Sequence, residues 1–364
     1  MSALPEERPD HREQKLVEIR REAEQRGFVS SRGVMPSGAP IPRASEQTGY
    51  YGMPLLKEPQ WQWEIPLYFF VGGAAGSSAV IGAMADWIGD DYELASHARW
   101  LAVGGVGLSS ALLIADLGRP SRFLNMLRVI KLQSPMSVGA WVLSAFGSMA
   151  AATAFVKAVQ KRWDWLPIRI VGNLAQFGSA TLGLPFHNYT GVLIGATVIP
   201  AWNRNIKTLP IHFGMSGVQA ACSILELAGH SDKRALNLLA LAAAGWETYE
   251  GVHLETRQER VLHPLKRGAS GWITRLGGVL SGPLPLALRS VAALVGTSSS
   301  QTKLRRTAAL CGIAGSLLTR YGWVQAGHSS AKDWRQPLEI GGAEITPLAE
   351  PPVEIKDLGV EKTA

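Results

Sequence analysis

Three long stretches of this chain contain no Asp, Glu, Lys or Arg. They run from Ile65 to Ala85, from Ser134 to Val156 and from Ile170 to Asn203. Because a helix needs about 20 apolar residues to cross the hydrocarbon core of a bilayer, each stretch predicts a membrane-spanning helix. The third stretch is long enough for one span and an amphipathic lead-in.

Five further apolar segments have charges at their ends or one or two charges inside. They are Trp100 to Ala115, Thr208 to Leu225, Ala235 to Val252, Leu276 to Thr302 and Thr307 to Ala331. The sequence therefore predicts an all-α integral membrane bundle of about eight transmembrane helices. We expect a polar N-terminal arm over residues 1–60, the membrane domain over 61–331 and a flexible C-terminal tail over 332–364.

The charge indicates what kind of partner such a bundle has, and the cysteine content limits the metal sites it can hold. The net charge of +7 comes in large part from Lys and Arg in predicted loops and tails, where anionic lipid headgroups or an acidic protein are a better match than nucleic acid. Cys222 and Cys311 are the only cysteines. A cluster or zinc site held by four thiolates is therefore excluded in this chain, and we expect no metal site.

The orientation of the bundle follows from the ends of the chain. Met1 to Gly27 is rich in charge and has no apolar core of a signal peptide, so we expect the first span to act as a signal-anchor. Eight spans place both termini on one side. The basic residues of the N-terminal arm favour the cytoplasmic side.

Polar side chains mark the ends of the first two predicted spans. Glu64 begins the first span, and Tyr68 follows one turn later on the same face. Glu64 is either an interfacial carboxylate, in contact with water or Arg119, or a proton-accepting group at the membrane boundary. Asp116 and Arg119 end the second span three residues apart, so they form either a structural ion pair or part of a proton route.

The fourth predicted span carries His187 and Tyr189 close to Pro185. We expect the proline to break the helix locally. Non-helical backbone at membrane depth is tolerated only against protein or a wet cavity, so this segment points to a functional site. The alternative is a structural histidine whose polar atoms are satisfied.

Four of these segments together resemble the NrfD/polysulfide reductase membrane subunit family. They are Trp63 to Phe70 with the glycine run after it, Asp116 to Phe123, Ser134 to Trp141 and Tyr189 to Leu193. The preceding Tyr50 to Lys57 resembles the arm that one branch of the family carries before its first span. The resemblance covers roughly residues 50 to 330.

The resemblance implies a multi-pass subunit of the bacterial cytoplasmic membrane that holds neither haem nor an iron-sulfur cluster. Such a subunit exchanges electrons between a quinone, menaquinone or ubiquinone, and a ferredoxin-like iron-sulfur subunit. A molybdopterin-type or other catalytic subunit lies beyond the latter.

The resemblance also implies where the quinone head lies, near the start of the first helix and a tyrosine of the fourth. The positions expected to bind it are Trp63, Tyr68, His187, Tyr189 and Arg119, and those expected to move protons are Glu64, Asp116 and His187. Polysulfide-reductase-type members have a histidine near the start of span one, where this chain has Glu64. The resemblance therefore does not identify the proton partner of the quinone in this chain.

Two other classes of function remain open. A di-haem cytochrome b needs pairs of facing histidines, and only His187 and His212 lie in neighbouring spans. A proton-conducting or secondary transport subunit would use charges inside the later helices. The candidates for that path are Glu226, Glu247, Glu250, Arg289 and Arg320. Structural ion pairs, such as Glu247 or Glu250 with Arg289 or Arg320, explain the same charges.

Overall fold

The computed structural model describes residues 56–117, 120–295, 298–333 and 336, and a few short pieces before them, 18, 21–22, 25, 29–30 and 33–34. The chain divides into two compact units, 1–55 and 56–364. In the first unit, β1 (Val29–Ser30) pairs antiparallel with β2 (Gly33–Val34). The candidate sites belong to the second unit.

The second unit is built from helices. The long ones are α2 (Glu64–Trp87), α3 (Tyr92–Asp116), α4 (Pro135–Arg162), α5 (Leu166–Gly195), α7 (Leu209–Leu225), α8 (Arg234–Thr256), α10 (Gly268–Ser281), α11 (Pro283–Leu294) and α12 (Ser298–Lys332). Short helical turns connect them: η2 (Pro120–Leu127), α6 (Pro200–Asn203), η3 (Glu226–His230), η4 (Arg260–Leu262) and α9 (His263–Lys266).

Four segments in the described part of the chain are long and apolar enough to cross a membrane. They are α2, α3, α4 and the stretch Gly268–Leu294, which comprises α10 and α11. The predicted helical build is thus confirmed, with four helical segments that could span a membrane. Eight spans remain a prediction.

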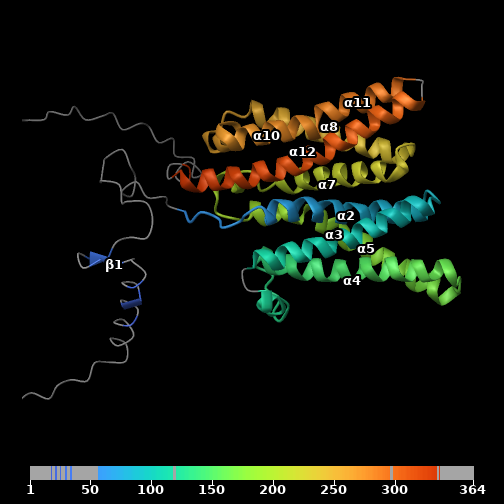
Figure 1. Cartoon of the computed structure of the whole chain (residues 1–364), viewed down its shortest axis with the longest axis horizontal. Helices are drawn as coiled ribbons and strands as arrows, with labels where there is room; N and C mark the ends of the chain where they lie inside the picture. Colours follow the sequence, from blue (N-terminus) through green and yellow to red (C-terminus); the bar gives the residue numbers. More distant parts are fainter. Residues whose placement is uncertain are drawn as a thin grey trace, which may run out of the picture. The chain divides into compact units, whose positions relative to one another are not determined.

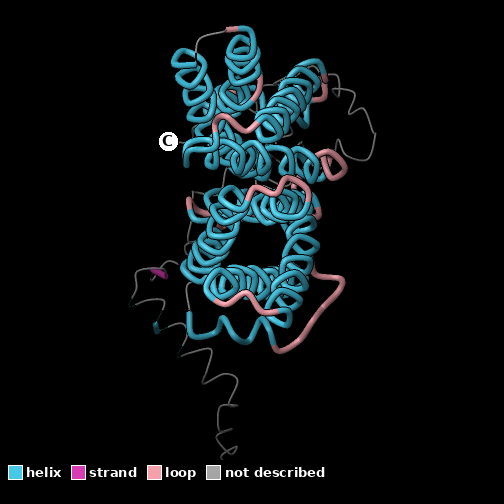
Figure 2. The backbone as a smooth tube through the Cα atoms, turned by 90° about the vertical axis from the view of Figure 1, so that its right-hand side faces the viewer, coloured by secondary structure: helices cyan, strands magenta, loops and turns pink. Residues whose placement is uncertain are grey.

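The helices form two groups, which Figure 1 shows from the side and Figure 2 nearly end-on. In the first group α2, α3, α4 and α5 contact one another in a ring. In the second, α12 packs against α7, α10 and α11, and α8 contacts α7, α10 and α11. The two groups meet where α7 packs against α2 and α5. α2 also contacts α12, so it packs against both long helices of the second group that reach the first.

Glycines allow α2 to approach its neighbours closely. A Cβ atom on Gly76 would lie 2.7 Å from the carbonyl oxygen of Gly183 in α5, and one on Gly217 of α7 would lie 2.9 Å from Gly73. Small residues commonly bring transmembrane helices into such contact. These contacts fix the depth at which side chains of α2, α5 and α7 face each other.

Two helix boundaries differ from the sequence prediction. The expected break at Pro185 is wrong, because α5 runs as a continuous helix through this proline. The expected seventh span, Leu276 to Thr302, begins earlier, at Gly268, and is interrupted at Gly282 (φ −105°, ψ −98°) before Pro283 starts α11. Pro283 sits in a first helical turn, where its missing N–H is not needed.

Candidate functional site

A cavity of about 990 Å³ lies where α2 begins and α3 ends. Its lining residues are Lys57 to Gln62, Glu64, Ala115, Asp116 and His328. Because α2 and α3 are neighbours, the first residue of α2 and the last of α3 meet at one end of the bundle. Glu64 and Asp116 interact electrostatically there, and one carboxylate oxygen of Glu64, Oε2, is buried without a hydrogen-bond partner.

A short segment before α2 forms part of the wall of this cavity. We call residues 56–62 the strap. The Glu58 carboxylate accepts a hydrogen bond from His328 Nδ1 and lies 3.0 Å from Lys332 Nζ at the end of α12. Trp61 stacks on Trp202 with ring centroids 5.3 Å apart. The hydrogen bond from Lys332 holds the pKa of Glu58 below its ordinary value, so the carboxylate stays charged at neutral pH.

Tyr68 and Tyr189 come together one turn deeper. α2 and α5 run antiparallel, as predicted, since Gly76 faces Gly183 and Gly72 faces Phe186. Tyr68 is buried and interacts electrostatically with Tyr189, whose ring lies over Gly139. The Tyr189 hydroxyl donates a hydrogen bond to the carbonyl of Pro135 at the start of α4.

His187 lies away from these groups. Its ring packs against Gly214 of α7, its backbone nitrogen and Cβ lie against Gly76 of α2, and its Nδ1 is 3.3 Å from the carbonyl oxygen of Gly183. Gly76 is 12 residues beyond Glu64, or about 18 Å along a helix. The structure therefore brings together Glu64 with Asp116 and Tyr68 with Tyr189, whereas His187 sits deeper, at the boundary of the two helix groups.

Of the residues predicted to bind the quinone, the structure describes Trp63 but not Arg119. The Trp63 side chain is 56% exposed, and its carbonyl accepts a hydrogen bond from Tyr321 of α12. Trp63 is thus at the rim, suited to a headgroup-level position. Arg119 lies outside the described residues, so its pairing with Asp116 remains a prediction.

The charges of the later helices are buried, but their partners differ from those expected. Arg289 of α11 pairs with Glu226 at the end of α7, with side chains 1% and 0% exposed, and also donates to Ser223. The expected pairing of Arg289 with Glu247 or Glu250 is therefore wrong. Glu247 instead accepts a hydrogen bond from Ser281 and lies 3.4 Å from His212 Nδ1.

Arg320 occupies the boundary between the two helix groups. Its guanidinium donates to Ser216 Oγ (2.5 Å), to the carbonyl of Phe213 (2.8 Å) and to that of Ser316 (3.1 Å). A Cβ atom on Gly73 of α2 would lie 3.1 Å from it. Arg320 interacts electrostatically with both His187 and Glu247. Arg320 therefore lies where helices of the two groups meet.

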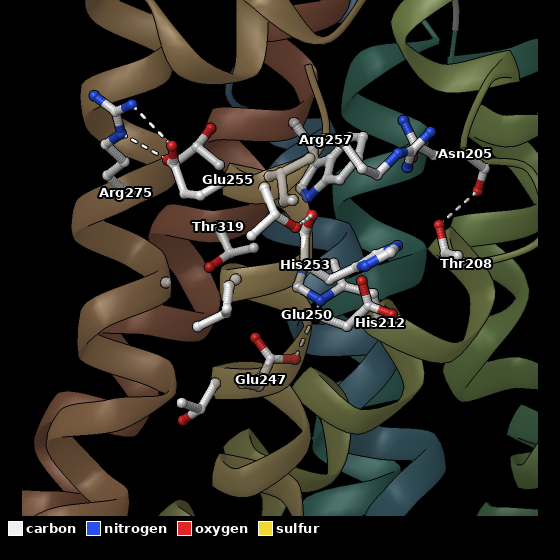
Figure 3. A pocket seen from close by; sticks show the side chains of 18 of the residues that line it. Asn205, Thr208, His212, Glu247, Glu250, His253, Glu255, Arg257, Arg275 and Thr319 are labelled. Carbon is white, nitrogen blue, oxygen red and sulfur yellow. Dashed lines mark hydrogen bonds and ion pairs between the residues drawn. The ribbon is translucent and has the colours of Figure 1, made fainter. Parts of the chain in front are cut away.

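A second cavity, of about 500 Å³, lies among α7, α8, α10 and α12 (Figure 3). His212 and Glu247 line its deep part, and Thr208, Glu250 and Thr319 line its sides. Its apolar walls come from Leu209, Leu254, Val279, Pro283 and Trp323. The cavity thus combines carbon walls with a buried carboxylate and a histidine.

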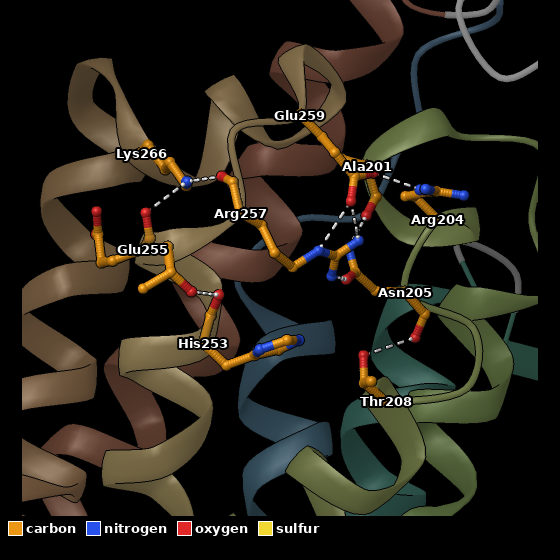
Figure 4. A network of polar contacts seen from close by, with 10 residues as sticks. Ala201, Arg204, Asn205, Thr208, His253, Glu255, Arg257, Glu259 and Lys266 are labelled. Atoms are coloured by element: carbon orange, nitrogen blue, oxygen red, sulfur yellow. Dashed lines mark hydrogen bonds and ion pairs between the residues drawn. The ribbon is translucent and has the colours of Figure 1, made fainter. Parts of the chain in front are cut away.

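A polar network that includes the lining residues Asn205, Glu255 and Arg257 lies at one end of this second cavity (Figure 4). Arg257 donates to Asn205 Oδ1 at 2.7 Å and to Glu259 Oε1 at 2.8 Å, and Glu259 also pairs with Arg204. Lys266 Nζ donates to the carbonyls of Glu255 and Arg257. Burial acts to raise the pKa of Glu259, but the hydrogen bonds from Arg204 and Arg257 outweigh it and hold this pKa below its ordinary value.

The sequence analysis missed several of these residues. Tyr321 and His328 of α12 stand seven residues apart, a spacing that places them on one helix face and was a usable signal. His212 was considered only as a haem ligand. Its contact with Glu247 joins residues far apart in the chain, and no local spacing reports such a contact. No group of three or more His, Cys, Asp or Glu side chains with metal-site geometry occurs in the described ranges.

Comparison with known proteins shows which family the chain resembles. The family model described as "Polysulphide reductase, NrfD" matches residues 55–242. The C subunit of the polysulfide reductase of Wolinella succinogenes is 26% identical over 181 residues, which cover 45% of this protein and 56% of that subunit. The match thus spans little more than half of this relative.

Proposed function

The chain belongs to the polysulphide reductase NrfD family, and from this premise we propose that it is the quinone-reactive membrane subunit of a respiratory oxidoreductase. The observation that carries the proposal is the cavity at the start of α2. There the buried, unpartnered oxygen of Glu64 faces a space that Asp116 also lines, next to the tyrosine pair.

The cavity at Glu64 supplies polar partners for the head of a quinone, and its apolar lining comes from Pro59, Trp61 and Ala115. Reduction of a quinone by two electrons takes up two protons, and the ring oxygens need hydrogen-bond partners in a largely apolar slot. Glu64 and Asp116 both line the cavity, so either carboxyl group can exchange a proton with a ligand held there. Trp61 lines the cavity and can orient a ring, and the phenols of Tyr68 and Tyr189 lie deeper along α2 and α5. His187 lies too deep to join them at the same oxygen.

Electrons enter from outside the chain under this proposal. An extrinsic ferredoxin-like iron-sulfur subunit would dock over the end of the bundle at which α2 begins, with a molybdopterin-type or other catalytic subunit beyond it. The family membership supports this arrangement, and so does the strap, because Glu58 and Trp61 fix ordered backbone at that same end.

Conservative substitutions test the site. Glu64→Gln and Tyr68→Phe should each lower quinone turnover, for Glu64→Gln by about a hundredfold if it transfers a proton. Glu93→Gln, an exposed carboxylate at the start of α3, is the control. Tyr189→Phe should lower the rate more than His187→Ala, since only Tyr189 lies beside Tyr68. Normal rates in both Glu64→Gln and Tyr68→Phe would place the quinone elsewhere.

A second candidate function is proton conduction without a quinone site. The buried charges Arg320, Glu247, Glu226 and Arg289 of the second helix group favour it. The purified chain in vesicles distinguishes the two. Proton flux that needs no quinone and is lost in Glu247→Gln would favour the conducting subunit.

A further inference from the structure

Helices α8 and α10 touch at two levels and separate between them. Toward the outer end, Arg275 of α10 donates to both carboxylate oxygens of Glu255, at 2.7 and 3.0 Å. Toward the deep end, a Cβ atom on Gly282 would lie 2.9 Å from the backbone nitrogen of Thr248. Between these contacts stand Gly251 on α8 and Gly278 on α10. Both line the second cavity, and neither has a neighbour within 4 Å of the place where a Cβ would be.

This gap, the Gly251–Gly278 window, opens sideways. The stretch from Thr248 to Glu255 rises about 10 Å along α8, which is wider than an aromatic ring. Val252 and Val279 beside the window are 60% and 50% exposed, so its rim is apolar. At the outer end, Arg257 bridges Asn205, which also lines the cavity, and Glu259 (Figure 4). This apolar rim favours entry of a ligand from the hydrocarbon side of the bilayer over entry from water.

The deep part of the cavity contains two buried polar atoms that lack a hydrogen-bond partner. His212 Nδ1 and Glu247 Oε1 lie 3.4 Å apart, and neither makes a hydrogen bond, although the Glu247 side chain is only 1% exposed (Figure 3). Buried polar atoms in proteins nearly always have a hydrogen-bond partner. A lipid acyl chain would leave both atoms unpartnered. A carbonyl or hydroxyl oxygen on a flat ring would satisfy them, with Leu209 and Trp323 as walls.

We propose that this cavity is a second ligand site, which takes the ring of a quinone or quinol from the bilayer through the Gly251–Gly278 window. Its volume of about 500 Å³ suits a small ligand. Only the class of ligand rests on the proposed function. The position is independent of it, because the cavity shares no lining residue with the cavity at Glu64.

Photolabelling tests the site with a defined probe. The full chain, in nanodiscs of zwitterionic phospholipid, is irradiated with a short-tailed azido-quinone, and labelled peptides are mapped by mass spectrometry. We expect saturable labelling within residues 247–256 and 274–283 that excess unlabelled quinone abolishes.

Two leucine variants give a matched comparison. Gly278→Leu fills the window and should reduce labelling of α8 and α10 about tenfold, since overpacking of this size disfavours ligand entry. Gly245→Leu is the control, because Gly245 also has open space around it but does not line the cavity. Thermal unfolding shows whether both variants are folded. Labelling of α8 and α10 that is absent, does not saturate or is unchanged in folded Gly278→Leu overturns the proposal and leaves the cavity to water or lipid.

The two sites separate in the same experiment. Labels on α2 and α5 without labels on α8 and α10 would overturn the second site and leave the proposed function standing. Labels on α8 and α10 alone would support the second site and contradict a quinone at Glu64. We expect labels on both pairs of helices, with Gly278→Leu reducing only the labels on α8 and α10.

Discussion

Arg289 and Glu226 show what a buried charge pair contributes. Both side chains are almost completely buried. Each charge has lost its hydration, and its attraction to the opposite charge compensates for that loss. Breaking such a pair costs about 3–5 kcal/mol, because it leaves an uncompensated charge. We expect Glu226→Gln or Arg289→Met to destabilise the chain by this amount, and the double variant to be less affected than either single one.

The measurement is thermal unfolding in detergent for the wild type, both single variants and the double variant. Glu255→Gln serves as the control, since its pair with Arg275 is about half exposed and is worth little. Destabilisations that simply add would show that the two charges do not depend on each other.

Glu259 gives a prediction about pH. Its pKa is held below the ordinary value of 4.5 in the folded chain, chiefly by Arg204 and Arg257 against the effect of burial. A carboxyl group with a lowered folded-state pKa stabilises the fold above its unfolded pKa, and this contribution is lost as the pH falls through the folded value. We therefore expect Glu259→Gln to lower the melting temperature at pH 7.

The difference between Glu259→Gln and the wild type should shrink as the pH falls from about 4.5, the ordinary pKa of the unfolded carboxyl, through the lower folded-state value. Unfolding curves from pH 7 to pH 3.5 measure it. A constant difference across this range would mean that the hydrogen-bond geometry of Glu259, not its charge, stabilises the network.

At the level of helices, the crossing of α2 and α7 depends on two glycines. A Cβ on Gly217 would lie within 3.1 Å of three backbone atoms of Gly73. Since these are backbone atoms, neither helix can yield without moving as a whole. We expect Gly217→Leu to cost at least about 1–3 kcal/mol and to lower the yield of folded protein.

Gly245→Leu is the matched control here too, because its Cβ would meet nothing within 4 Å. Fluorescence-detected size-exclusion and thermal unfolding compare the two variants. Equal stability of both would show that α2 and α7 do not pack as closely as described.

Helix positions were largely predictable from the sequence, and their interruptions were not. Charge-free runs indicate segments that are shielded from water, and α2, α4 and α5 lie where the apolar pattern places them. Pro185 was predicted to break α5, yet a membrane helix keeps its backbone hydrogen bonds wherever neighbours permit, and a proline removes only one. Gly282 does interrupt the chain, because Pro283 begins a new helix directly after it.

The candidate site was predictable only in part, for a related reason. Glu64, Tyr68 and Tyr189 follow from helix ends and antiparallel neighbours, which local sequence indicates. The partners of the deeper charges depend on how helices rotate against one another. Glu226 therefore meets Arg289 and Glu247 meets His212, contacts that no spacing along the chain predicts.

The whole molecule offers one end of the bundle to a partner. The strap, the rim residue Trp63 and the cavity at Glu64 all lie where α2 begins, and an electron donor or acceptor must approach a quinone held there. The N-terminal arm leads along the sequence into the strap. The arm lies almost entirely outside the described residues, so its role as part of the dock for an iron-sulfur subunit, with termini in the cytoplasm, stays a prediction.

Two deletions test that role. Removing Met1 to Pro40 spares Tyr50 to Lys57, whereas removing Met1 to Lys57 takes this segment away and ends just before Glu58, which the contacts with His328 and Lys332 hold in place. We expect the longer deletion to insert normally but to retain about tenfold less iron-sulfur subunit on co-purification, as for the loss of about 1.4 kcal/mol of binding free energy. The shorter deletion should retain most of it. If the longer deletion inserts and still binds the partner at full yield, the arm is a tail beside lipid headgroups and the strap alone marks the docking end.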